Sequence, residues 1–207
     1  MGEKSVALAN RVLQNNNMQN PISQTLKAGL TLKFKLSIVF IILVLVISLD
    51  QATKLWAVET LRGQSSVEYM GGFFTFTYAE NTGAFLGFGG DWSRQVRFIV
   101  FAVVVLLGLV GMFWYLLKKE VSKANLIAYS FILAGGLGKL WDRMSRANGG
   151  VIDFMVFDSG LNLNLGFIKI PMRTGVVNIA DIAIVIGVLL ALSAEYYFDR
   201  RLLKSAK

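Results

Sequence analysis

Four long apolar stretches separated by polar segments dominate the pattern of the chain. They cover residues 36–56, 98–117, 126–141 with its flanks, and 176–198. At about 1.5 Å per residue, helices of this length cross a hydrocarbon core of about 30 Å. The pattern therefore predicts an all-α membrane protein with four transmembrane helices, and an even number of crossings places both chain ends on the same side.

Basic residues mark three of the segments that flank these stretches. They are Lys27, Lys33 and Lys35; Lys118, Lys119 and Lys123; and Arg200, Arg201, Lys204 and Lys207. Because Lys and Arg collect in cytoplasmic loops, both termini and the second connection are expected to be cytoplasmic. The connections at 57–97 and 144–175 then face the outside.

Period-two alternation in the two outward connections indicates strands. Apolar and polar residues alternate over Gly71–Tyr78, Leu161–Leu165 and Phe167–Ile170, with glycines at the flanks. We expect these segments to form a small sheet on the external surface of the membrane, where it would position a substrate.

The polar ends of the chain divide it into three parts. Residues 1–32 form a cytoplasmic tail with a Gln/Asn-rich stretch, residues 33–200 form the membrane domain, and residues 201–207 form a basic cytoplasmic tail. The first apolar run is too far along the chain and too long to be a cleaved signal peptide, so it is expected to be retained.

The amino-acid composition limits the kinds of binding and catalysis that the chain can carry out. The chain is 55% hydrophobic and carries a formal charge of +8, but its basic residues flank apolar stretches, as is typical of membrane topology and not of nucleic-acid binding. It has no cysteine and no histidine. Disulfides, cysteine nucleophiles, Ser-His-Asp triads and the usual zinc sites are therefore excluded, and no metal or cofactor is expected.

Ionisable and amide residues gather at the outer ends of the predicted helices. They are Asp50, Lys54, Glu80, Asn81, Lys139, Asp142, Arg143, Asp153, Asn178 and Asp181. Polar groups in a membrane are costly unless they face the bundle interior, so such a cluster predicts a functional site. Two adjacent carboxylates tend to share one proton, which suits them to activate water. Asp153 is expected on a mobile loop and Asp181 at a helix N-terminus, where the dipole favours its charged form.

Several of these residues also have simpler interpretations. Asp50 and Lys54, four residues apart, could form only a helix-stabilising pair. Asp142 and Arg143 could form an interfacial salt bridge that anchors the third helix. Asn81 could do no more than shape a turn.

The small residues Gly135-Gly-Leu-Gly138 predict a close contact between helices. Such a contact would bring the third and fourth helices together, and with them the carboxylates that lie at their outer ends.

Two other functions are compatible with a polar cluster of this kind. A Ser/Lys peptidase would use Lys54 or Lys139 with Ser48 or Ser130 as nucleophile. A small transporter would distribute charges through the depth of the membrane, whereas the stretches 38–49 and 100–110 are purely apolar.

Five ordered motifs decide among these readings. They are Asp50-Gln-x-x-Lys54, Asn81-Thr-Gly-Ala-Phe85, Gly135-Gly-Leu-Gly-x-x-x-Asp142-Arg143, Val151-Ile-Asp-Phe154 and Val177-Asn-Ile-Ala-Asp181. In order and spacing, residues 36–198 resemble the lipoprotein signal peptidases (signal peptidase II, aspartyl protease family A8). One position departs: the family usually has Asn where Lys139 stands, and the segment between Arg143 and Asp153 is slightly long.

The resemblance implies a membrane aspartyl endopeptidase that removes signal peptides from diacylglyceryl-modified prolipoproteins, cutting N-terminal to the lipidated cysteine. It implies that Asp153 and Asp181 are catalytic. It also implies support or substrate-binding roles for Asp50, Lys54, Asn81, Gly135, Arg143 and Asn178. The expected location is the bacterial inner membrane, with the sheet and site toward the periplasm, membrane lipids as neighbours and sensitivity to globomycin-type peptides.

Overall fold

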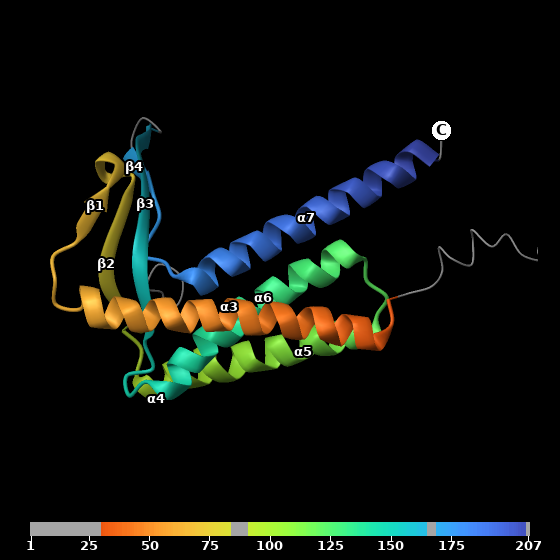
Figure 1. Ribbon diagram of the computed structural model, residues 1–207, viewed down its shortest axis with the longest axis horizontal. Coiled ribbons are helices and arrows are strands. Elements are labelled where there is room, and N and C mark those ends of the chain that lie inside the picture. The colour runs from red at the N-terminus through yellow and green to blue at the C-terminus, as the bar shows by residue number, and fades with distance from the viewer. Residues whose placement is uncertain (1–29, 84–90, 165–168, 206–207) are drawn as a thin grey trace, which may run out of the picture.

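The apolar stretches form long helices that end at a small β-sheet, as the computed structural model shows for residues 30–83, 91–164 and 169–205 (Figure 1). The helices are α3 (Leu32–Leu61), α4 (Arg94–Phe98), the π-helical turn η3 (Ile99–Val104), α5 (Val105–Lys118), α6 (Lys123–Ser145) and α7 (Ile179–Ser205). Each predicted stretch corresponds to a helix, with α4, η3 and α5 following one another in the second. Residues 1–29 of the expected N-terminal tail lie outside the described part of the chain.

Three of these helices are long and apolar enough to cross a membrane. Within the described residues they span Leu32–Leu61, Gln95–Lys118 and Ile179–Tyr196. Their outward faces expose large apolar side chains, among them Phe40 and Leu45 on α3 and Leu189 on α7. Such exposure is unfavourable in water and is satisfied by lipid. The chain is therefore a multi-pass membrane protein.

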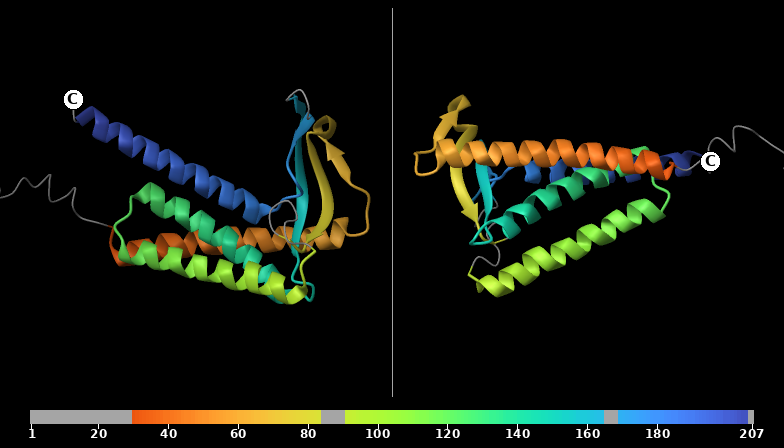
Figure 2. Two further views of the ribbon diagram at one scale, coloured as in Figure 1. Left: turned by 180° about the vertical axis from the view of Figure 1, so that it is seen from behind. Right: turned by 60° about the horizontal axis from the view of Figure 1, so that its bottom comes forward.

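Helix α6 differs because it occupies the middle of the bundle. It packs against α3, α5 and α7 (Figure 2), and it buries ten residues where the longer α3 buries six. Its neighbours shield it, so α6 can carry glycines and charged residues that a lipid-facing helix could not.

The sheet contains four antiparallel strands in the order β1-β2-β3-β4. Its strands are β1 (Val67–Tyr69), β2 (Phe74–Asn81), β3 (Val151–Asn164) and β4 (Lys169–Arg173). The predicted alternation at 71–78 corresponds mainly to β2, and that at 161–170 to the ends of β3 and β4, with residues 165–168 outside the described part. The sheet lies across one end of the bundle, while α3 begins and α7 ends at the other (Figure 1).

A hydrophobic core joins this sheet to the end of α3. It consists of Ala57, Leu61, Ile152, Phe154 and Met155, all of them buried. The packing fixes the first half of β3 against the bundle. The expectation that Asp153 lies on a mobile loop is therefore wrong, because the five successive buried residues 151–155 belong to strand β3, which pairs with β2.

Glycines allow the close approach of α6 to α7. A Cβ atom at Gly135 would collide with the backbone oxygen of Ala180 and with the side chain of Ile184. A Cβ at Gly138 would lie 2.8 Å from a carboxylate oxygen of Asp50. The predicted packing contact is confirmed, and it places the start of α7 directly against the half of α6 that is nearer the sheet (Figure 1).

Gly135→Ala should therefore destabilise the protein, because the backbone of α7 must move to admit the methyl group. We expect a loss of roughly 1–3 kcal/mol, as for other overpacked cores, measured by thermal unfolding in detergent micelles. Gly111→Ala on α5 is the matched control, since a Cβ there meets nothing within 4 Å. The control should be neutral or slightly stabilising, and equal stability of the two variants would contradict the close contact.

Candidate active site

The start of α7 is held by a reciprocal cap. The side-chain oxygen of Asn178 accepts from the backbone N–H of Asp181 at 3.0 Å, and a carboxylate oxygen of Asp181 accepts from the N–H of Asn178 at 3.3 Å. Two N–H groups that a helix leaves unpaired are satisfied in this way. Asp181 thus lies in the first turn of α7, where the sequence predicts it.

The same asparagine connects α7 to β3. Its fully buried amide donates to Asp153 Oδ1 at 2.6 Å and to the carbonyl of Ile152 at 3.0 Å. Beside it, the backbone of Val177 exchanges hydrogen bonds with that of Met155 at 2.7 and 2.9 Å. Asn178 therefore bridges the two aspartates and fixes their relative positions.

Both aspartates face one cavity of about 590 Å³ between the sheet and the helices. Polar groups on its wall are Asn81, Lys139, Arg143, Asp153 and Asp181, and apolar residues supply much of the remainder, including Phe101, Val105 and Ile184. The cavity thus combines two carboxylates with an apolar surface. No cluster of acidic side chains suited to a metal occurs in the described ranges.

The two carboxylates differ in their surroundings. Asp153 is only 2% exposed, whereas the side chain of Asp181 is 24% exposed and lies 2.9 Å from the Lys139 ammonium. Burial raises the pKa of Asp153 to about 6, and the negative charge of Asp181 adds to the rise, while Lys139 and a hydrogen bond with Asn81 oppose it. Asp153 therefore retains a proton well above the pH at which an exposed aspartate loses it.

Behind the cavity lies a buried ionic network. Lys54 Nζ lies 2.7 Å from Asp50 Oδ2 and 2.7 Å from Asp142 Oδ2, and all three side chains are at most 1% exposed. Gln51 donates to both carboxylates at 3.1 Å. Asp50 and Lys54 are thus more than a surface pair, and Asp142 pairs inside the protein instead of anchoring α6 at the interface.

The network also reaches the two elements that carry Asp153 and Asp181. The second oxygen of Asp50 accepts from the backbone N–H of Ala180 at 3.0 Å, and Asp142 accepts from the N–H of Ile152 at 3.4 Å. Helices α3, α6 and α7 and strand β3 therefore meet at these two carboxylates.

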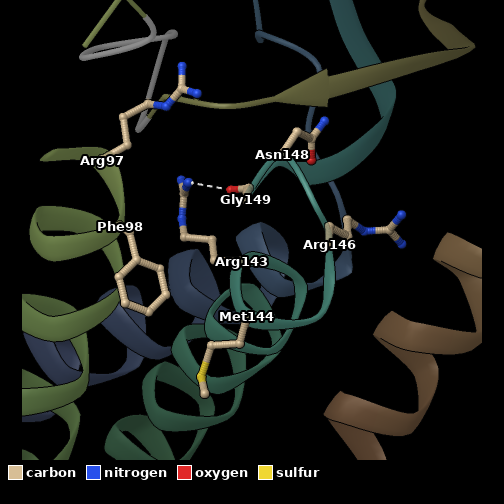
Figure 3. Close-up of a pocket in the computed structure, with 7 residues that line it drawn as sticks. All are labelled: Arg97, Phe98, Arg143, Met144, Arg146, Asn148 and Gly149. Atoms are coloured by element: carbon tan, nitrogen blue, oxygen red, sulfur yellow. Dashed lines mark hydrogen bonds between the residues drawn. The ribbon is translucent and has the colours of Figure 1, made fainter. Parts of the chain in front are cut away.

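Arg143 holds two loops beside the cavity. Its guanidinium donates to the carbonyl of Gly149 at 3.1 Å and also to that of Gly83, and it lies 4.9 Å from the ring centre of Phe101. The hydrogen bond to Gly149 is drawn in Figure 3, in a small pocket of about 80 Å³ that Arg97 and Arg146 also line. Arg143 is thus occupied by backbone carbonyls.

Asn81 shapes a turn and also lies on the cavity wall. Its side-chain oxygen accepts from the N–H of Gly83 at 3.0 Å, which shapes the turn after β2. It also lines the cavity and hydrogen-bonds with Asp153. The remaining residues of its motif, 84 and 85, lie outside the described part of the chain.

Two contacts near the site escaped sequence reasoning. One is the side-chain amide of Gln51, which bridges Asp50 and Asp142 from within the motif Asp50-Gln-x-x-Lys54. The other is a link between β2 and the segment that follows α6, where Glu80 accepts from Tyr78 at 2.5 Å and from Asn148 at 2.6 Å. The hydrogen bond from Tyr78 lowers the pKa of Glu80. Neither contact carries a signal in local spacing.

Comparison with known proteins identifies close relatives. The profile of the family described as signal peptidase (SPase) II matches residues 42–197. The lipoprotein signal peptidase of Psychromonas ingrahamii is 41% identical over 158 residues, which cover 74% of this chain and 81% of that protein. The lipoprotein signal peptidase of Clostridium novyi is 32% identical over 72% of this chain and 91% of its own.

A solved structure shares the fold. It is a bacterial membrane enzyme determined by the in meso method at 2.3 Å resolution, with a TM-score of 0.61 and 26% sequence identity. The similarity covers 77% of this chain and 87% of that one.

Lys54→Met should destabilise the protein strongly, because it leaves two buried carboxylates without a cation. Breaking a buried ion pair from one side costs roughly 3–5 kcal/mol, measured here by thermal unfolding in micelles. Lys33→Met, an exposed lysine on the same helix, is the control and should change little. A Lys54 variant as stable as the control would show that the network does not hold the bundle together.

Asp153→Asn should stabilise the protein at neutral pH. The folded-state pKa of Asp153 is raised from 3.8 to about 6, so the wild type has its full stability below about pH 4 and loses part of it as the pH rises through 6. At about 1.4 kcal/mol per pKa unit, the variant should gain roughly 3 kcal/mol relative to wild type between pH 4 and pH 8.

Unfolding of both proteins at several pH values measures this gain, and the shared titration of other groups cancels in the difference. Asp158→Asn, on the same strand but outside the large cavity, is the control. A constant difference between Asp153→Asn and wild type at every pH would contradict the raised pKa.

Proposed function

The chain belongs to the signal peptidase II family, and we propose that Asp153 and Asp181 catalyse its reaction, the removal of signal peptides from prolipoproteins. The observation that carries this proposal is the meeting of both carboxylates at one cavity, joined through the amide of Asn178. Aspartic-type hydrolysis needs two carboxyl groups that hold one proton between them, and the unequal burial of this pair favours that state.

The reaction follows from the general chemistry of such a pair. The ionised carboxylate removes a proton from a water molecule, and the resulting hydroxide attacks the carbonyl carbon of the scissile peptide bond. The protonated carboxyl group then transfers its proton to the leaving amine as the C–N bond breaks. The first carboxylate ends protonated and the second ionised, and proton exchange restores the starting state.

We place the cleavage N-terminal to a diacylglyceryl-modified cysteine. The cavity walls supply apolar residues beside the carboxylates, and the outer faces of the helices are suited to lipid. Acyl chains lying in the outer leaflet would bring the modified cysteine to this height. A globomycin-type peptide, being apolar and carrying peptide carbonyl groups, would occupy the same cavity and inhibit.

The membrane arrangement that fits this substrate has four spans. Helix α6, shielded by its neighbours, is the additional span beside the three apolar helices. The bundle lies in the bacterial inner membrane with both termini in the cytoplasm and the sheet in the periplasm. Support comes from the basic residues Lys33, Lys118 and Lys119, which lie at the end of the bundle opposite the sheet.

The remaining predicted site residues act by positioning. Asp50 and Lys54 hold the start of α7 through the buried network, Gly135 permits its approach, and Asn178 aligns the aspartates. Asn81 and Arg143 shape the loops at the cavity wall and lie close enough to contact a bound peptide.

The serine alternative finds no support in the geometry. The Ser130 hydroxyl is buried and donates to the carbonyl of Leu126 one turn earlier, at 2.6 Å. Ser48 is exposed on α3, half a turn before the buried Asp50. The described lining of the large cavity includes neither serine.

Asp153→Asn and Asp181→Asn should each abolish cleavage of a lipidated prolipoprotein. Loss of one acid–base group lowers the rate by roughly 100- to 10,000-fold, which a gel-shift assay with purified protein in micelles would detect. Ser48→Ala and Ser130→Ala are the controls and should cleave as wild type does. Retained activity in either aspartate variant would refute the pair.

The same assay tests the substrate class. Burial of acyl chains contributes about 0.8 kcal/mol per methylene, so an unlipidated precursor should be cleaved far more slowly than the lipidated one. Equal cleavage of the two precursors would show that lipid is not recognised.

A further inference from the structure

Lys139 forms an ion pair with Asp181 that is separate from the buried network around Lys54. Its ammonium lies 2.9 Å from Asp181 Oδ1, and the two side chains, 26% and 24% exposed, both line the large cavity. Lys139 lies one turn beyond Gly135 on α6, where that helix contacts the start of α7. The ion pair therefore spans the two helices at the cavity wall.

The contacts make the two carboxylates electrostatically unequal. Asp181 faces a cation and lies in the first turn of α7, and both features favour a negative charge. Asp153 is buried and accepts from the neutral amide of Asn178. A single proton shared by the pair is accordingly more stable on Asp153 than on Asp181.

We propose that Lys139 is a positioning residue that keeps Asp181 ionised, so that Asp181 takes the proton of the attacking water and Asp153 protonates the leaving amine. This inference rests on the proposed function of the aspartate pair and assigns a role to each member. It also assigns a role to Lys139, which stands where the family usually has Asn.

The assignment has a consequence for pH dependence. The pair consists of Asp153 on β3 and Asp181 on α7, and the charged groups that act on it are Lys54 on α3 and Lys139 and Arg143 on α6. Among the cations, Lys139 has the largest effect on Asp153 and lowers its pKa. Without Lys139, the pKa of Asp153 rises further, so the acid keeps its proton to a higher pH.

The test is the pH profile of kcat/KM for a fluorogenic lipidated prolipoprotein peptide, measured on the full-length protein in micelles. In wild type, activity should fall as the pH rises through about 6. In Lys139→Met and Lys139→Asn this descending limb should move to higher pH by about half a pH unit or more. In Lys139→Arg it should stay at the wild-type pH.

Each outcome of this test bears on a separate claim. Profiles of Lys139→Met and Lys139→Asn that superimpose on wild type would overturn the inference and leave the proposed function intact. Absence of cleavage by wild type would overturn the proposed function itself. A merely structural role for Lys139 would lower activity at all pH values without moving the limb.

Infrared titration tests which of the two aspartates holds the proton. It requires neither enzymatic activity nor a folded Lys139 variant. Wild-type protein should show a protonated carboxyl band that disappears as the pH passes about 6. Asp153→Asn should lose this band, and Asp181→Asn should keep a band of this kind. The reverse pattern would assign the proton to Asp181 and overturn the inference. Asp158→Asn serves as the matched control and should leave the band unchanged.

Discussion

One buried ammonium organises the end of the bundle on which the sheet lies. Lys54 neutralises one of the two carboxylates it contacts, which leaves one negative charge with little access to water. That charge is offset by partial positive charges, the N–H of Ala180 at the start of α7 and the N–H of Ile152 in β3. Because desolvation of each ion costs several kcal/mol, such a network is stable only when every partner is present. Three helices and a strand are thereby held in one arrangement.

The position of the proposed catalytic pair, Asp153 and Asp181, follows from this network. Asp50 fixes the first turn of α7, and Asn178, which caps that turn, hydrogen-bonds to Asp153 in β3. Asp153 is therefore held in place by a chain of buried hydrogen bonds. The cost is a carboxylate in surroundings that oppose its charge, shown by its pKa of about 6. The rest of the fold must supply the stability that this residue removes, as is common where function requires a strained or desolvated group. The effects on stability expected of Lys54 and Asp153 are thus opposite.

The elements that could be predicted from the sequence are those whose signals are local. Apolar length predicted the helices, alternation predicted strands, and the position of Asp181 near the start of the fourth apolar stretch predicted that it lies at a helix N-terminus. The prediction failed at Asp153, because a short run of residues buried on both faces resembles a connecting loop when its strand partner is distant in sequence. The partners of Asp142 and Lys139 were also beyond reach, since they depend on how α6 crosses α3 and α7. The glycines at 135 and 138 set those crossings and indicate close contact, but they do not specify which charged side chains then meet.

The charges of this site therefore fall into two kinds with different tolerances. Those behind the cavity are at most 1% exposed and hold the helices together, so a change in any one of them affects the whole bundle. The Lys139–Asp181 pair is about a quarter exposed, and solvent screens it enough that its removal leaves no buried charge without a partner. A cation at that position can consequently be gained or replaced by a neutral amide without loss of the fold. Because the Lys139 ammonium pairs with Asp181, it biases how a proton is divided between two acids that already differ in burial, and under the proposed mechanism that division determines which of them acts on water.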